Sequence, residues 1–140
     1  MVAVSVAGVT PTPAQVRNAV ESHCRFWNER DQASWSALFA DQVTFDDPVG
    51  APTKHGADAV RDSWERSLTP GRSWTLIPTR IIVCADEAAV LIRNEGDIHG
   101  KQVVVESVEI WKVRLDGLVV AVRAYFESDP TVNSEYFVPT

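Results

Sequence analysis

The chain has 140 residues, of which 45% are hydrophobic, and five of them are Trp. This length and composition predict a single globular domain over residues 1–140 with its own hydrophobic core. Nineteen acidic residues outnumber 13 basic ones, which gives a formal net charge of −6, and no run of basic residues is present. Nucleic acid and anionic membranes are therefore poor candidates for partners.

The composition of the two chain ends predicts the boundaries of the domain, and the cysteines predict the cellular compartment. Residues 1–11 lack the basic start and sustained apolar stretch of a signal peptide and are expected to form an N-terminal arm. The core is expected over residues 13–127, followed by a C-terminal tail over residues 128–140. Cys24 and Cys84 show no metal-type spacing, so we interpret them as reduced, mostly buried thiols in a cytoplasmic protein.

Three helices are predicted in the first half of the chain. The first begins at Thr12, which forms a capping box with Gln15, and His23 lies in the middle of its apolar stripe. A histidine at such a position can be a core residue or a functional one, and both readings stay open. The others are predicted over Gln32–Ala40 and Ala57–Leu68. The second helix is expected to bury Trp35, Leu38 and Phe39.

A short strand over Val43–Asp47 is predicted between the second and third helices, and Pro48–Gly50 end it in a turn. Because side chains two apart share a face, Asp47 falls on the apolar face and Asp46 on the opposite one. A carboxylate on an apolar face is costly to ionise unless a neighbour compensates. The alternative is that Asp47 only starts the turn.

The second half of the chain changes to strand periodicity. Short connections separate its four predicted strands, so they should form an antiparallel meander. Helices and strands are largely segregated along the chain, which predicts an α+β fold with helices on one face of a curved sheet. The predicted strands are Ser73–Ala85, Ala88–Ile98, Lys101–Leu115 and Leu118–Glu127.

The strand predicted over Lys101–Leu115 has apolar residues on both faces. If the helices cover one face, a second copy of the chain is the simplest cover for the other, so we expect a homodimer through the sheet. Glu109 lies on the face that carries Trp111 and needs a partner or a proton. The alternatives are an ion pair with Arg93 or Arg123, or a sheet whose two faces are exchanged.

Three stretches carry a resemblance to a known family. They are ALFADQVTFDDPVG, HGADAVRDSWERSL and IWKVRLDGLVVAVRAYF. Together they resemble the ketosteroid isomerase branch of the NTF2-like, SnoaL-like superfamily, over roughly Val16 to Phe126. The resemblance implies a cone-shaped α+β barrel, with three N-terminal helices packed on a curved, mostly antiparallel sheet around an apolar pocket.

The resemblance also implies roles for three residues. Asp47 takes the place of the base that moves a proton between carbons of a steroid. Glu109 replaces an aspartic acid, and His23 a tyrosine, that donate hydrogen bonds to the oxygen of the dienolate. Glu109 keeps the donor chemistry on a longer arm, while His23 can donate only through a protonated ring nitrogen. Both changes leave the true substrate open.

The leading hypothesis is a cofactor-independent steroid delta-isomerase-like enzyme acting on a steroid-like or other polycyclic ketone. One alternative is a SnoaL-like cyclase or epoxide hydrolase with another apolar substrate, and the other is a non-catalytic binding protein. No cofactor is expected. No metal is expected either, because His23, His55 and His99 lack ligand spacing. The expected substrate-binding residues are Ser63, Trp64, Asn94, Ser107, Trp111 and Phe126, and Ser63 and Asn94 make this pocket more polar than is usual in the family.

Overall fold

A twisted six-stranded sheet forms one layer of the molecule and three helices form the other. The computed structural model describes residues 10–127, so the predicted tail and most of the predicted arm lie outside the described residues. The helices are α2 (Pro13–Asn28), α3 (Gln32–Ser36) and α4 (Gly56–Ser67). The strands are β1 (Phe39–Asp46), β2 (Lys54–His55), β3 (Arg72–Cys84), β4 (Glu87–Ile98), β5 (Lys101–Val113) and β6 (Val119–Tyr125).

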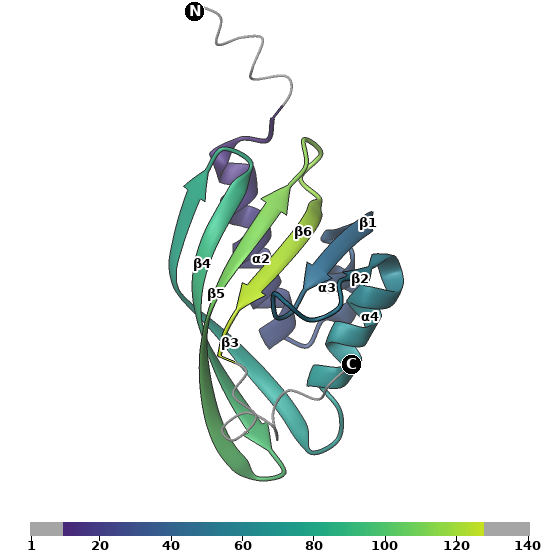
Figure 1. Ribbon diagram of the computed structural model, residues 1–140, viewed down its shortest axis with the longest axis vertical. Coiled ribbons are helices and arrows are strands. Elements are labelled where there is room, and N and C mark those ends of the chain that lie inside the picture. Colours follow the sequence, from purple (N-terminus) through teal and green to yellow (C-terminus); the bar gives the residue numbers. More distant parts are fainter. Residues whose placement is uncertain (1–9, 128–140) are drawn as a thin grey trace, which may run out of the picture.

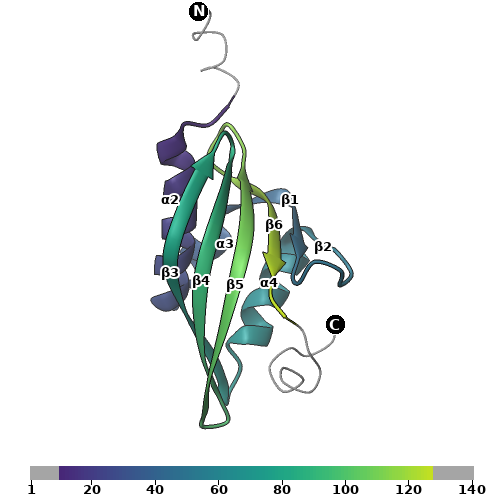
Figure 2. The same ribbon diagram turned by 60° about the vertical axis from the view of Figure 1, so that its left-hand side comes forward.

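The strands follow the order β2-β1-β6-β5-β4-β3, and only the β1–β6 pair is parallel. The sheet is strongly curved, but it stays open between its edge strands β2 and β3 (Figure 1). All three helices lie on the same side of the sheet, behind the long strands in the view of Figure 2. The predicted α+β class, the antiparallel meander and the packing of three helices on a curved, mostly antiparallel sheet are confirmed, and the sheet is not closed.

The face of β5 that turns toward the helices is the one that was predicted. On the inner face Val103, Ser107, Trp111 and Val113 are buried, while Val104 and Val108 on the outer face are exposed. Glu109 is half-buried on the inner side. The alternation of side chains along a strand therefore directs Glu109 toward the helices.

The segment around Leu38 differs from the prediction. Helix α3 ends at Ser36, and Phe39, expected in that helix, begins β1. The cause is tertiary pairing: the Leu38 carbonyl accepts the Val119 amide at 2.9 Å, which commits the following backbone to the sheet. Strand β2 was not predicted, since two residues are too short to show periodicity.

Both cysteines are free, as expected, but only Cys24 is buried. Cys84 is exposed at the end of β3, so the expectation that both thiols are buried is wrong for that residue. No helix in residues 10–127 is both long and apolar enough to cross a membrane. The cytoplasmic location remains a prediction from the chain's two free thiols.

The end of α2 is fastened to β3, and this contact fixes one wall of the interior. The Trp27 indole donates to the Trp74 carbonyl at 2.9 Å. The Asn28 amide pairs with both backbone groups of Leu76, at 2.8 and 2.9 Å. Opposite Trp74 on β4 lies Gly96, where a Cβ would come within 2.6 Å of the indole ring. Trp74 therefore depends on a glycine at that position.

Candidate functional site

A cavity of about 640 Å³ lies between the helices and the inner face of the sheet. This volume suits a ligand of steroid size. Eight of the nine predicted site residues line it. Trp64 does not; it packs at 5.1 Å from Trp27 and 5.4 Å from Trp35, ring centre to ring centre, and lines a smaller neighbouring depression. The eight lining residues are His23, Asp47, Ser63, Asn94, Ser107, Glu109, Trp111 and Phe126.

The turn after β1, which contains Asp47, is bound to β6, the strand that pairs with β5 at Glu109. The Val49 amide donates to the Ala124 carbonyl at 2.9 Å, and Ala124 is the β6 partner of Glu109. Asp47 is open to the cavity, but enough protein surrounds it for burial to raise its pKa, an effect that the charge of Lys54 partly offsets. Asp47 thus reaches the cavity instead of only starting a turn.

Asp46, the neighbouring acid, has a different role. It accepts hydrogen bonds from the Thr53 hydroxyl and the Arg123 guanidinium, the latter at 3.2 Å. These contacts tie β1 to the following loop and to β6. Two consecutive aspartates are therefore divided between the two faces, as strand alternation predicts.

Glu109 has an indole as its partner and no ion pair among residues 10–127. Trp111 Nε1 donates to Oε1 of Glu109 at 2.9 Å. Burial raises the pKa of Glu109 to about 7; the Trp111 hydrogen bond opposes this rise and the charge of Asp47 adds to it. A substantial fraction of Glu109 is therefore protonated near neutral pH.

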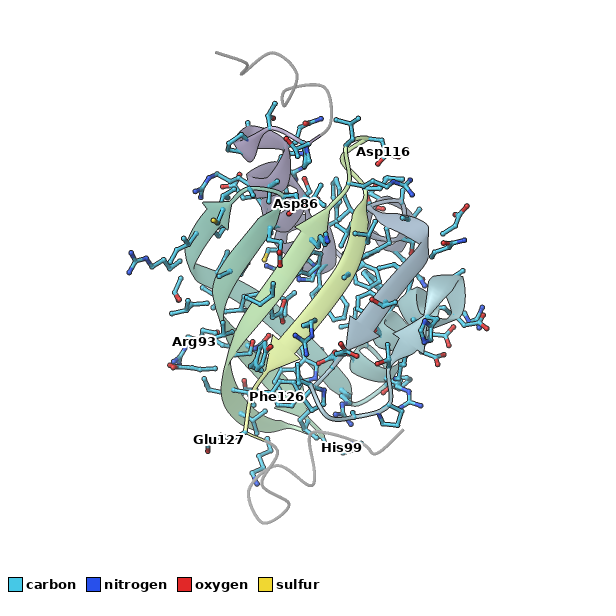
Figure 3. The ribbon with its side chains drawn as sticks, turned by 45° about the horizontal axis from the view of Figure 1, so that its top comes forward. Asp86, Arg93, His99, Asp116, Phe126 and Glu127 are labelled. Carbon is cyan, nitrogen blue, oxygen red and sulfur yellow. The ribbon has the colours of Figure 1, made fainter. Side chains whose placement is uncertain are left out.

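The alternative partners of Glu109 are engaged elsewhere. Arg93 forms an ion pair with Glu95 at 2.9 Å, and Arg123 forms one with Asp46 at 3.2 Å. Figure 3 shows Arg93 at the outer surface of the sheet, near the end that carries Phe126 and Glu127. Neither arginine lines the cavity, so neither neutralises Glu109.

His23 is buried and neutral. Trp35 Nε1 donates to His23 Nδ1 at 2.9 Å, so Nδ1 is unprotonated and the ring proton lies on Nε2. Burial lowers the pKa of His23 to about 3. The buried Nε2 has no hydrogen-bond partner within the described part of the chain. His23 therefore holds one N–H donor that the protein itself leaves unused.

Trp111 joins the two groups. Its ring centre lies 4.3 Å from that of His23, while its indole N–H binds Glu109. The side chain is only 1% exposed, so it cannot shift without disturbing the core. Since Glu109 Oε1 accepts from the indole, a proton on this carboxyl belongs on Oε2. The two residues then hold two donors, the buried His23 Nε2–H and the Glu109 Oε2–H.

Asn94 and Ser107 form a polar pair further along the inner face. The Asn94 amide donates to the Val105 carbonyl at 2.9 Å and to the Ser107 hydroxyl oxygen at 3.0 Å. This leaves the Asn94 carbonyl oxygen as an acceptor. No group of three or more His, Cys, Asp and Glu side chains in residues 10–127 is arranged to hold a metal ion.

Four residues that line the cavity were not predicted from the sequence as part of the site. Trp35 was predicted only as a core residue, and its hydrogen bond to His23 has no signal in the sequence. Lys54, Arg66 and Arg72 also line the cavity, although they come from β2, α4 and β3. Only the strand alternation could have placed Arg72 inside, since it shares a face with Trp74 and Leu76.

The fold and the cavity define a class: small α+β proteins in which helices and a curved sheet enclose an apolar pocket with a few polar groups. The chain belongs to the SnoaL-like domain family, which it matches over residues 20–122. It is 28% identical over 113 residues to a steroid delta-isomerase of Nocardioides simplex, an alignment that covers 81% of this chain and 90% of the relative.

Solved structures share the fold. The epoxide hydrolase/cyclase-like enzyme SalBIII, described in pyran ring formation, superposes with a TM-score of 0.74 at 21% identity, covering 82% of this chain and 92% of SalBIII. RV0760c of Mycobacterium tuberculosis, solved with estradiol-17beta-hemisuccinate, gives a TM-score of 0.68 at 24% identity, covering 82% and 95% of the two chains. These likenesses confirm an NTF2-like architecture.

The raised pKa of Glu109 predicts a pH-dependent stability. Between its ordinary pKa of 4.5 and about 7, the folded protein keeps a proton that the unfolded chain releases, so this group lowers stability as pH rises. Glu109→Gln removes the titration. Urea titrations give the free energy of unfolding of both proteins at each pH. We expect the value for Glu109→Gln minus the value for wild type to be about 1–3 kcal/mol larger above this pH window than below it. Glu106→Gln, on the outer face of the same strand, is the control; equal pH dependence of wild type and Glu109→Gln would contradict the assignment.

The Trp35 hydrogen bond predicts the state of the His23 ring. Nitrogen NMR of wild type should show Nε2 protonated and Nδ1 an unprotonated acceptor, without titration between about pH 5 and pH 8. In Trp35→Phe the Nδ1 resonance should shift, because its donor is gone. Trp64→Phe is the control, since Trp64 packs in the same aromatic cluster at 5.4 Å from Trp35. An unchanged Nδ1 resonance in Trp35→Phe would show that the indole does not set the ring.

Proposed function

We propose that the protein is a cofactor-independent isomerase that moves a proton within a ketosteroid or a similar polycyclic ketone. One observation carries the proposal: a carboxylate and two hydrogen-bond donors, Asp47, Glu109 and His23, line one largely apolar cavity. The chain's 28% identity to a steroid delta-isomerase supports the same reaction.

Each residue has a defined role in the proposed reaction. Ionised Asp47 removes a proton from the carbon next to the ketone, and the ketone oxygen gains negative charge as the dienolate forms. His23 Nε2–H and Glu109 Oε2–H donate hydrogen bonds to that oxygen. Asp47 then returns the proton to a carbon further along the conjugated system. No proton is gained or lost overall, so the reaction needs no cofactor.

The electrostatics favour catalysis over simple binding. An acid held in a tight ion pair can act neither as base nor as proton donor. Within residues 10–127, neither Asp47 nor Glu109 forms an ion pair, whereas the nearby Asp46 does. Burial raises the pKa of both cavity acids, and the charge of Asp47 raises the pKa of Glu109 further, so an ionised Asp47 favours a proton on Glu109. One ionised base and one neutral acid are what the reaction requires.

A second function is supported by the polar pair further along the cavity. Asn94 and Ser107 provide an acceptor and a hydroxyl that suit a water molecule or a second oxygen of a substrate. A cyclase or epoxide hydrolase would use such groups, and the fold of SalBIII is similar. Turnover of an epoxide to a diol, with no isomerisation of ketosteroids, would favour this reaction over the first.

Asp47→Asn tests the proposed base. Wild type should convert a β,γ-unsaturated ketosteroid to its conjugated isomer, followed by ultraviolet absorbance, and the variant should lower kcat by about a hundred- to ten-thousandfold. Ligand affinity should change little, because the amide fills the same space. Asp46→Asn is the matched control, since Asp46 binds Arg123 on the other face. Full activity in Asp47→Asn would refute the role of Asp47.

The outer face of the sheet supports the expected homodimer, which remains a prediction. Leu91, Val108 and Tyr125 are paired neighbours on three adjacent strands and are 39%, 39% and 43% exposed. Light scattering should show a dimer for wild type and a monomer for Val108→Glu. Leu115→Glu, at an exposed apolar position outside this face, should stay dimeric. A monomeric wild type would end the proposal.

A further inference from the structure

Three cations line the catalytic cavity of a chain whose net charge is −6. They are Lys54 on β2, Arg66 in the last turn of α4 and Arg72 at the start of β3. None of them forms an ion pair with an acid of residues 10–127, although four other cations there do. The mechanism proposed above uses none of the three.

Among the three cations, Arg72 is the one whose burial most clearly lowers the stability of the folded protein. It lies on the inner face of β3 with Trp74 and Leu76, which are 8% and 7% exposed. Its Nε is buried without a hydrogen-bond partner in the described chain, and burial lowers its pKa. A partly buried guanidinium without a partner destabilises the folded protein. Asp97, the acid nearest in the strand register, pairs with Ser73 on the opposite face and binds the Gly100 amide and the Gln102 side chain.

Lys54 and Arg66 add further positive charge to the same cavity. Burial lowers the pKa of Lys54, and the positive charge of Arg66 lowers it further, so the two cations lie close enough to repel. Asp62 and Asp47 act in the opposite direction on Lys54 but neither reaches ion-pair distance. The local field therefore favours an added negative charge.

Arg72 and the oxyanion donors occupy different ends of the cavity, whereas Lys54 lies nearer to Asp47, whose charge acts on it. Arg72 pairs with Ile98 of β4, whereas Glu109 pairs with Val90. Eight residues separate these two β4 positions, which corresponds to about 26 Å along an uncurved strand. Asn94 lies between them, with the apolar walls formed by Trp74 and Leu76. An elongated ligand can thus contact both ends.

We propose that Arg66 and Arg72 form an anion subsite, to which Lys54 adds positive charge from the side of Asp47, and that the substrate is an apolar polycyclic ketone with a carboxylate or sulfate at the end remote from the ketone. The ketone oxygen then meets His23 and Glu109, and the anion meets Arg66 and Arg72. This assignment rests on the proposed function for its ketone end only. The anion end rests on the unpaired charges themselves.

The test compares ligands that differ only in charge. Testosterone hemisuccinate and its methyl ester share a ring system, and so do anilinonaphthalene sulfonate and phenylnaphthylamine, which lacks the sulfonate. Equilibrium binding is measured by fluorescence at low and high ionic strength. We expect each anion to bind about ten- to hundredfold more tightly than its neutral analogue. This advantage should shrink at high salt.

Variants locate the effect. Arg72→Gln and Arg66→Gln should each reduce the ratio of anion to neutral affinity by about tenfold, with less than about twofold change for the neutral ligands. Arg61→Gln is the control, because Arg61 lies on the same helix but binds Asp58 at 2.8 Å outside the cavity. Arg72→Gln should also unfold at the same or a higher temperature than wild type, since it removes an unpaired charge.

The outcomes separate this proposal from the proposed function. Equal affinity for anionic and neutral analogues in wild type, or an unchanged ratio in both arginine variants, overturns the anion subsite even if isomerisation is observed. A charge preference that depends on Arg72 supports the subsite even if no ketosteroid is turned over.

Discussion

Two indole N–H groups determine what the cavity can do. An indole nitrogen only donates, so each partner atom must be an acceptor. Trp35 engages Nδ1 of His23 and Trp111 engages Oε1 of Glu109, both at 2.9 Å. The remaining polar atom of each residue is then Nε2–H or, when the carboxyl is protonated, Oε2–H. The aromatic framework thereby turns two amphoteric side chains into hydrogen-bond donors.

The same framework explains why these donors stay neutral. Trp27, Trp35 and Trp111 surround His23, with ring centres 6.4, 6.3 and 4.3 Å away. Burial among apolar rings disfavours the charged forms of both residues, so the pKa of His23 falls and that of Glu109 rises. A protonated imidazole beside an ionised Glu109 would instead have favoured an ion pair between the two residues. The low polarity of the tryptophan cluster prevents that state.

Much of this arrangement was predictable, because it depends on short periods in the sequence. Strand alternation placed Asp47 and Glu109 on inner faces, and helical spacing placed His23 in the buried stripe of α2. Partners were harder to predict. The hydrogen bond between Trp35 and His23 joins two helices, and the anchoring of Val49 on Ala124 joins a turn to β6. Such contacts follow from the relative placement of elements, for which no local pattern exists.

Two unpaired polar groups give the two ends of the cavity different preferences for ligand groups. A buried donor at His23 Nε2 and a buried guanidinium at Arg72 Nε both lack partners among the described residues, and each lowers stability in the ligand-free protein. They lie toward opposite ends of one space, with Glu109 near the first and Arg66 near the second, while Lys54 interacts with both Asp47 and Arg66. A ligand that relieves both costs must carry an acceptor at one end and a negative charge at the other. Such a ligand would bind in one orientation, which is the orientation that the proposed reaction requires, with the ketone at the end that holds His23 and Glu109.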